Sequence, residues 1–257
     1  MSNIEMYGWD VVYASKISAL NPGLSGDTIS FDESFNIADN NVEVSASLNA
    51  WQITTGGSDA LVFFKVPCSS IKISNGDKTF RFKDGYFLIQ TNLKFVTDSN
   101  NISHLKIDTG EGNAKVLSAA FSDSGFGAFE IYARKGFQNW VNKQDSFPYN
   151  FISIKTYSES DNSDVIDFKA SKVNYAYINT SEEDGILAVL CKIAGSNNIE
   201  ETLQQVSPNA IPSGGSSVLI NKSIIENQIN NSNNIPDWAG SKNSRILIED
   251  NLVYQLH

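Results

Sequence analysis

Cysteine and histidine are scarce in this 257-residue chain, which contains two of each. Cys68 and Cys191 lie far apart in the sequence, without the spacing of a zinc site or a redox pair. Apolar residues surround both, which favours buried free thiols over a disulfide. His104 and the terminal His257 are the only imidazoles, and no GxSxG nucleophile motif accompanies them. We therefore predict no metal, no cofactor and no enzymatic activity.

Positive charge and long apolar runs are also lacking. The chain has 19 Lys and Arg against 29 Asp and Glu, a net charge of −10. Nucleic acids require a basic surface, so we expect no nucleic-acid partner. No stretch approaches the ~20 apolar residues of a membrane-spanning helix, and the first residues lack a signal-peptide pattern. We expect no transmembrane segment and a protein that is cytoplasmic as synthesised, so that any export requires a non-standard route.

Alternating apolar and polar residues occupy most of the chain. Short segments rich in Gly, Asn, Asp and Ser separate these runs, as expected of turns. Strand patterns include NVEVSASL, LVFFKV, TFRF, YFLIQTNLKFV, ISHLKI, KVLSAAF, AFEIYA, FISIKTY, VIDFKA, VNYAYI, ILAVLCKI, SVLI, RILIED and LVYQL. About twelve strands at this spacing predict an antiparallel meander and a β-dominated α+β fold class.

A helix is predicted near the start, over residues 7–24. Its apolar residues recur at the i, i+3, i+4 spacing of one helical face: Trp9, Val12, Tyr13, Ile17 and Leu20. A Pro-Gly pair at residues 22–23 ends the pattern. Because a helix of this length is stabilised mainly by packing, we expect it to lie against a large antiparallel sheet.

Two later segments also have helical patterns. Phe137, Trp140 and Val141 share a helical face within GFQNWVNKQ, while Ser223 and Glu226 form a capping-box pattern. The remaining long segments without periodicity, residues 196–216 and 230–239, are predicted to be flexible connections. Neither divides the chain clearly, so we predict a single domain over residues 1–257.

Two fragments suggest chemistry, although each has a simpler interpretation. Asp108, Thr109 and Gly110 spell the tripeptide of aspartic proteases, but that chemistry needs two carboxylates and no second copy exists. A hairpin turn before KVLSAAF is the favoured interpretation. The acidic run at residues 161–164 lacks the ligand spacing of a calcium loop and is predicted to be a solvated turn. A hydrolase using Asp108 or His104 is the remote alternative.

Several segments together resemble a known family. The chain begins with YGWDVVYA, continues with WQITTGG at residues 51–57, and later contains VNYAYI, GILAVL, LQQV and AIPSGGSSVLI in that order. These segments resemble the OrfX-type and P-forty-seven-type proteins of clostridial neurotoxin and insecticidal toxin gene clusters, over residues 7–229. The resemblance implies a TULIP fold, a tubular lipid-binding architecture in which an amphipathic helix lies in a strongly curved antiparallel sheet. Several relatives are considerably longer than this chain.

The resemblance also implies a function. It indicates a non-enzymatic toxin-cluster accessory or insecticidal component that binds a lipid or a co-encoded sister protein of the same family. Release of the protein together with a toxin complex would fit this context. The apolar face of the predicted first helix supplies the candidate lipid-binding residues: Trp9, Tyr13, Ile17 and Leu20. A helix-to-sheet core is the favoured explanation of the same residues, because every amphipathic helix needs such contacts. A purely structural protein–protein interaction module, with no lipid ligand, is the alternative function.

Overall fold

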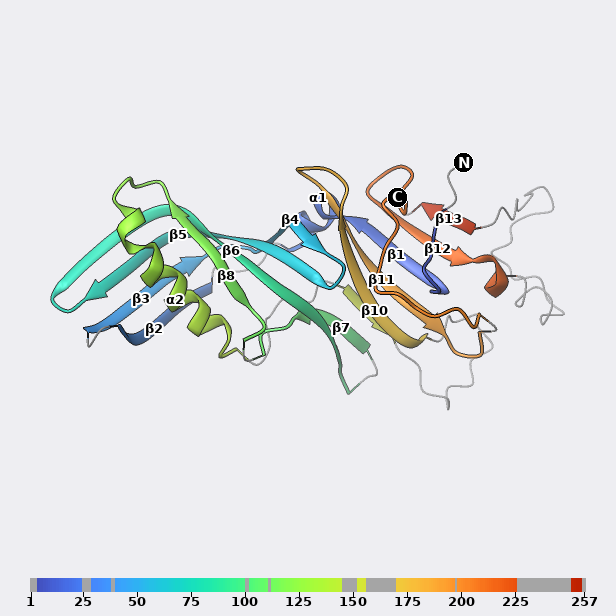
Figure 1. The fold of residues 1–257 in the computed structure, drawn as a ribbon, viewed down its shortest axis with the longest axis horizontal. Helices are drawn as coiled ribbons and strands as arrows, with labels where there is room; N and C mark the ends of the chain where they lie inside the picture. Colours follow the sequence, from blue (N-terminus) through green and yellow to red (C-terminus); the bar gives the residue numbers. More distant parts are fainter. Residues whose placement is uncertain are drawn as a thin grey trace.

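Two antiparallel sheets lie end to end along the long axis of the computed structural model (Figure 1). The structure describes residues 4–24, 29–37, 40–99, 102–110, 112–144, 152–155, 170–196, 198–225 and 251–255. Every strand pair within these residues is antiparallel, as the short turns predicted. Among them, no helix has the length and apolar character needed to cross a membrane.

The first sheet is strongly curled and contains eight strands in the order β2-β3-β5-β6-β7-β9, with β4 paired to β5 and β8 to β6. Its strands are β2 (Ile29–Ile37), β3 (Asn40–Leu48), β4 (Gln52–Ser58), β5 (Leu61–Asn75), β6 (Lys78–Thr97), β7 (Ile102–Ile107), β8 (Lys115–Phe121) and β9 (Ile152–Lys155). The long strands β5 and β6 form a hairpin whose turn contains Gly76 at φ 58°. This left-handed conformation suits glycine, as the turn signal SNGD predicted.

One amphipathic helix, α2 (Glu130–Val141), lies along this sheet and follows the short helix η2 (Phe126–Phe129) (Figure 1). We call the sheet surface that contacts α2 the inner face and the opposite surface the outer face. Gly136 lets the helix approach closely, because a Cβ there would lie 2.7 Å from the Cβ of Val44 on β3. The fold class is therefore confirmed as a helix packed in a strongly curved antiparallel sheet.

The second sheet contains five strands in the order β10-β11-β1-β12-β13. These strands are β10 (Ala170–Asn179), β11 (Gly185–Ile193), β1 (Val11–Lys16), β12 (Ser216–Asn221) and β13 (Asn251–Gln255). Both faces of its central strands are buried. One face joins the hydrophobic cluster of the first sheet, while the other packs beneath apolar side chains of the connection that precedes β12.

The predicted helix over residues 7–24 is wrong. Residues Val11–Lys16 form the central strand β1, hydrogen-bonded to β11 on one side and β12 on the other. Only α1 (Ile17–Leu20) and the 3-10 turn η1 (Asn21–Leu24) are helical there. Val11 faces one hydrophobic cluster, and Val12 and Ala14 face the other. Because both faces are buried, apolar residues follow one another and mask the period of two that identifies a strand.

The helix prediction at Phe137, Trp140 and Val141 is confirmed, but the helix begins earlier than expected. The predicted strand AFEIYA forms the end of η2 and the first turn of α2. Residues 222–225 are helical, and Glu226 of the predicted capping box lies outside the described residues. Residues 230–239 and 161–164 also lie outside them.

The topology differs from a simple meander. β1 is the first strand in sequence, yet it lies in the middle of the second sheet. The predicted hairpin at Asp108 is also wrong, because β7 and β8 pair with successive parts of β6 and not with each other. Residues 198–215 form no helix or strand, as predicted, although their flexibility stays a prediction.

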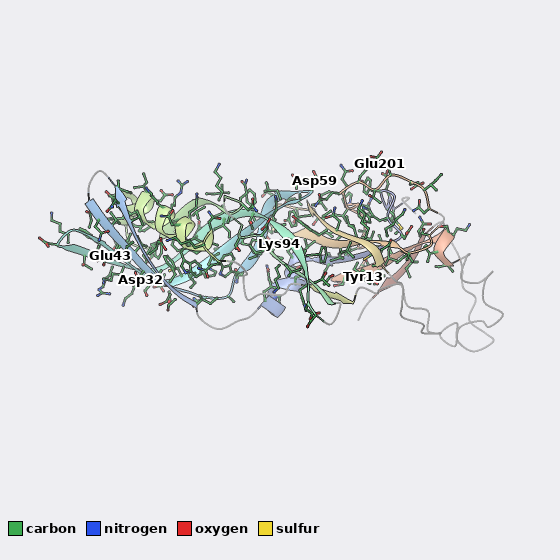
Figure 2. All side chains as sticks on the ribbon, turned by 90° about the horizontal axis from the view of Figure 1, so that it is seen from below. Tyr13, Asp32, Glu43, Asp59, Lys94 and Glu201 are labelled. Carbon is green, nitrogen blue, oxygen red and sulfur yellow. The ribbon has the colours of Figure 1, made fainter. Side chains whose placement is uncertain are left out.

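Two tyrosines on β10 join the two sheets. The Tyr175 hydroxyl donates to the Ala60 carbonyl at 2.6 Å and accepts from the Leu93 amide at 2.7 Å. Tyr177 exchanges two backbone hydrogen bonds of 2.8 Å with Asp59, which lies between the sheets in Figure 2. Burial raises the pKa of both phenols to about 12, so they stay neutral donors. One hydrophobic cluster also spans the joint. These contacts support the prediction of a single domain over residues 1–257, which stays a prediction.

Replacing Tyr175 with Phe should weaken this joint. The substitution leaves the buried amide of Leu93 without its acceptor, and such a loss costs roughly 1–3 kcal/mol. Urea unfolding should therefore show a lower free energy of unfolding for Tyr175→Phe. Tyr13→Phe is the matched control, since the side chain of Tyr13 is 36% exposed and the change should stay within about 0.5 kcal/mol. Equal effects of the two substitutions would contradict this role of Tyr175.

Candidate functional site

The inner face of the curled sheet is filled by aromatic side chains. Phe137 of α2 is fully buried and stacks on Phe87, with the ring centroids 4.3 Å apart. Its ring also lies 5.6 Å from Phe31 and 6.0 Å from Trp51. Trp140 stacks on Phe31 at 5.2 Å and on Phe137 at 5.9 Å. Side chains of α2 therefore fill the inner face of the sheet.

The polar side of α2 covers the edge of the sheet at β8. The Gln138 side-chain oxygen accepts from the Val116 amide at 3.2 Å, and Arg134 donates to the Val116 carbonyl at 3.1 Å. One turn further on, Asn142 both accepts from and donates to the backbone of Ala114, at 3.2 and 3.0 Å. These side chains are spaced by four residues, so one helical face satisfies an otherwise unpaired strand edge.

The four candidate lipid-binding residues do not line one groove. Trp9 is 1% exposed and Ile17 is 3% exposed, and they belong to hydrophobic clusters on opposite faces of the second sheet. Tyr13 is partly exposed on β1, and Leu20 packs partly buried against the larger cluster. Their expected common face depended on the helix that is absent. Their role in lipid binding stays a prediction.

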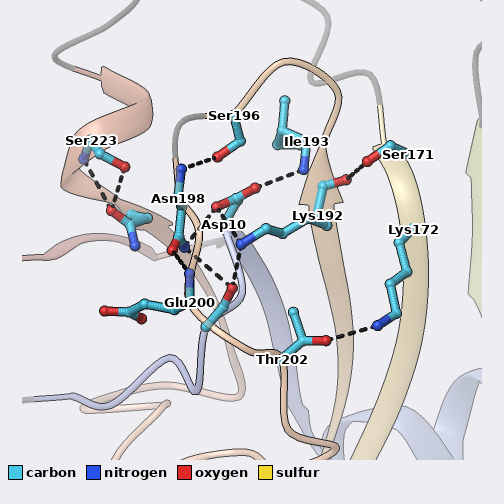
Figure 3. A network of polar contacts seen from close by, with 12 residues as sticks. Asp10, Ser171, Lys172, Lys192, Ile193, Ser196, Asn198, Glu200, Thr202 and Ser223 are labelled. Carbon is cyan, nitrogen blue, oxygen red and sulfur yellow. Dashed lines mark hydrogen bonds and ion pairs between the residues drawn. The ribbon is translucent and has the colours of Figure 1, made fainter.

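Asp10 is the centre of a buried polar network at the start of β1 (Figure 3). Its carboxylate accepts from the Ile193 amide at 2.8 Å and from the Asn198 side-chain amide at 3.0 Å. The Lys192 ammonium lies 3.6 Å from the same carboxylate and donates to the Gly8 carbonyl at 2.8 Å. The network ties the N-terminal segment to β11 and to the connection that follows it.

The same connection continues as an anchored segment, residues 198–204. Lys172 donates to the Thr202 hydroxyl at 2.8 Å (Figure 3), and the Trp9 indole donates to the Leu203 carbonyl at 2.6 Å. With Asn198 bound to Asp10, the segment is hydrogen-bonded near both of its ends.

Two large apolar side chains project from the anchored segment. Ile199 is 97% exposed and Leu203 is 47% exposed, whereas the backbone that carries them is held by the contacts above. A single exposed aliphatic residue is ordinary on a protein surface. Two exposed aliphatic side chains on one hydrogen-bonded segment make residues 198–204 a candidate protein-binding site. The sequence did not predict this site, because the segment has no helical or strand periodicity.

The residues considered for catalysis have structural partners. Asp108 pairs with Lys94 at 2.9 Å and accepts from the Asn113 side chain at 2.8 Å, so its carboxylate stabilises its own loop. His104 lies on β7 with its Nε2 3.3 Å from Asp98. No group of three or more His, Cys, Asp or Glu in the described part of the chain could hold a metal ion.

The prediction of free, buried thiols is confirmed for both cysteines. Burial raises the pKa of Cys68 to about 11 and that of Cys191 to about 12. Both are therefore neutral near pH 7, and a neutral thiol is a poor nucleophile.

Comparison with known proteins identifies the relatives of this chain. A family model described as "OrfX-like: Protein OrfX2/OrfX3/P47" matches residues 6–230. Protein OrfX3 of Clostridium botulinum (strain Kyoto / Type A2) is 25% identical, in an alignment covering 79% of this chain and 49% of the relative. Protein OrfX3 of Paraclostridium bifermentans is 24% identical, covering 79% and 48%.

Solved structures show the same fold. P47 of Clostridium botulinum E1 superposes with a TM-score of 0.64 at 16% identity, covering 87% of this chain and 54% of P47. P47 from Clostridium botulinum A2 also gives 0.64, at 19% identity, covering 85% and 52%. The chain thus spans about half the length of these relatives, and the expected TULIP-like architecture is confirmed. Since the family model matches most of its length, the chain belongs to the OrfX-like family.

Proposed function

We propose that this chain is a non-enzymatic component of a toxin gene cluster that acts by binding a sister protein of its own family. Membership of the OrfX-like family supports the toxin-cluster context. The packing of α2 favours a protein partner over a lipid held inside the tube, because Phe137 and its aromatic neighbours already fill the inner face.

The anchored segment, residues 198–204, is the observation that carries this proposal. Ile199 exposes almost its whole side chain to water, and covering such a side chain stabilises a complex by about 1.5–3 kcal/mol. Because hydrogen bonds to Asp10 and Trp9 already hold the segment, a partner would lose little conformational entropy in ordering it. Apolar side chains on a fixed backbone are typical of the centre of an interface.

Lipid binding is the competing function. For Trp9, Tyr13, Ile17 and Leu20 to contact one lipid, Trp9 and Ile17 would both have to leave their buried positions. A lipid in the tube would likewise require α2 to move away from β8. Native mass spectrometry of the gently purified protein tests this function directly. A co-purified lipid of fixed mass would favour it over protein binding.

Substituting Ile199 and Leu203 should weaken binding of a purified family protein encoded in the same cluster. We expect Ile199→Ser with Leu203→Ser to reduce its affinity at least about tenfold, equivalent to ~1.4 kcal/mol, measured by surface plasmon resonance. Ile131→Ser is the matched control, because Ile131 is 65% exposed on α2 and lies outside the anchored segment. Equal affinities for the double variant, the control and the unchanged chain would refute the proposed site.

A further inference from the structure

A groove of about 530 Å³ crosses the outer face of the curled sheet. It runs over four neighbouring strands, β2, β3, β5 and β6, on the side opposite α2. Figure 2 labels Asp32 and Glu43 at the end of the molecule that carries this sheet. The apolar residues at its floor, including Phe31 and Phe82, direct their rings to the inner face, where they contact aromatic residues of α2 or η2. Polar side chains therefore line the groove.

Strand register brings three cations together in this groove. Lys72 lies directly opposite Arg81, and Ser70 lies directly opposite Lys83. Side chains directly opposite each other have Cβ atoms about 4.5–5.5 Å apart. Lys83 is two residues from Arg81 on β6, so both project from the same face, about 6–7 Å apart. Three positive charges thus occupy a small part of a chain whose net charge is −10.

Little negative charge offsets this cluster. Within the described residues, no carboxylate forms an ion pair with Lys72, Arg81 or Lys83. Among the residues that the structure describes, Asp32 is the only acid that lines the groove, and Ser45 separates it from Lys72 across the sheet. Glu43 lies one row further away, opposite Ser74. Like charges opposite each other on a sheet are destabilising, so the cluster has an electrostatic cost in the absence of a bound anion.

We propose that the outer groove binds a phosphate or sulfate monoester carried on a small, hydroxyl-rich group. Arginine and lysine are the usual partners of such anions, and their charge-assisted hydrogen bonds are strong. Four serine hydroxyls complete the lining, and each can donate and accept: Ser30, Ser45, Ser47 and Ser70. The groove is larger than one oxyanion and has the size of a small-ligand site. This site is independent of the anchored segment, which belongs to the other sheet.

Isothermal titration calorimetry with glucose 6-phosphate tests the site. Separate titrations with glucose and with inorganic phosphate show how much each half of this ligand contributes to binding. We expect saturable binding that weakens as salt is added. Arg81→Gln should reduce the affinity about tenfold, since one charge-assisted contact is lost. Lys115→Gln removes one charge from an exposed position on β8 of the same sheet and should not change it. Lys72→Gln provides a second groove variant if Arg81→Gln folds poorly.

A parallel flotation experiment distinguishes a soluble ligand from a lipid headgroup, using phosphatidylcholine vesicles with and without phosphatidic acid. Glucose 6-phosphate binding that Arg81→Gln weakens indicates a soluble ligand. Binding only to vesicles containing phosphatidic acid, again weakened by Arg81→Gln, indicates a membrane source of the same phosphate group. The proposal is overturned if the protein binds neither glucose 6-phosphate nor vesicles containing phosphatidic acid. It is also overturned if Arg81→Gln and Lys115→Gln bind these ligands equally well. Thermal melting adds an independent check, because Arg81→Gln should raise Tm without ligand by removing repulsion from Lys72.

Discussion

Replacing Phe137 with Ala should lower the free energy of unfolding by about 3–5 kcal/mol, the usual cost of removing a buried Phe ring. The ring is fully buried between α2 and the sheet, and four aromatic rings have centroids within 6.0 Å of it: Phe31, Trp51, Phe87 and Trp140. Phe31 lies on β2, Trp51 just before β4, Phe87 on β6 and Trp140 on α2 itself, so they cannot all move inward and a cavity should remain. Denaturant unfolding followed by circular dichroism measures the effect.

Ile131→Ala is the matched control for this experiment, because the same helix exposes 65% of Ile131 to solvent. Its free energy of unfolding should change by no more than about 0.5 kcal/mol. Phe137→Leu retains more of the volume, so its cost should lie between the two. A loss below about 1 kcal/mol for Phe137→Ala would show that α2 is not the structural filling of the inner face. The tube would then be open to a lipid chain.

Replacing Asp10 with Ala should lower the free energy of unfolding by roughly 3–5 kcal/mol, the cost of removing one partner of a buried ion pair. The carboxylate is fully buried, and its loss leaves the Ile193 amide without its acceptor. The Asn198 side chain and the Lys192 ammonium each lose one partner and keep the Gly8 carbonyl as an acceptor. The anchored segment should also lose its first attachment. Hydrogen exchange should therefore increase over residues 198–204 as well as at the start of β1.

Asp10→Asn separates charge from shape. It keeps one acceptor oxygen but cannot pair with Lys192, so its cost should be smaller than that of Asp10→Ala. Glu182→Ala removes an exposed carboxylate before β11 and serves as the control, with an expected effect within about 0.5 kcal/mol. If Asp10→Ala left hydrogen exchange in the segment unchanged, Asp10 would not be what holds it, and the proposed protein-binding site would lose its physical basis.

Local patterns identified the curled sheet well. Its strands are buried mainly on the inner face, so apolar and polar residues alternate, as along β5, where Val62, Phe64 and Val66 are buried. Helix α2 was recognisable from Phe137, Trp140 and Val141, because its outer side contacts solvent and the helical period survives. In these elements one side contacts water, so apolar residues recur in the sequence at the spacing of a strand or a helix and the element can be predicted.

The second sheet was harder to predict for the opposite reason. β1 is central, and its first four residues, Val11 to Ala14, are apolar without alternation. The run from Trp9 to Leu20 therefore fitted a helix by coincidence. The lipid-binding candidates were selected by that period. Trp9 lies before β1 and Ile17 begins α1 after it, and the two side chains belong to different hydrophobic clusters.

Neither proposed binding site has a local pattern. Ile199 and Leu203 matter because distant residues, Asp10 and Trp9, fix the backbone beneath them. The outer groove exists because strand register places Lys72 opposite Arg81. A shift of register by one residue would turn one of these side chains to the inner face, and the hairpin turn and the burial of that face fix the register.

The sequence by itself determined the β-dominated fold class, the helix around Phe137, the family and the absence of an evident catalytic set. These properties depend on composition and on short-range periodicity, both of which act along the chain. Only the tertiary structure decided that the first segment is a strand and that side chains of α2 fill the inner face of the curled sheet. It also decided that three cations lie at neighbouring positions of β5 and β6, and that two exposed aliphatic side chains project from one hydrogen-bonded segment. Those outcomes depend on contacts between residues far apart in sequence, where the burial of both faces and the pairing register outweigh local preference.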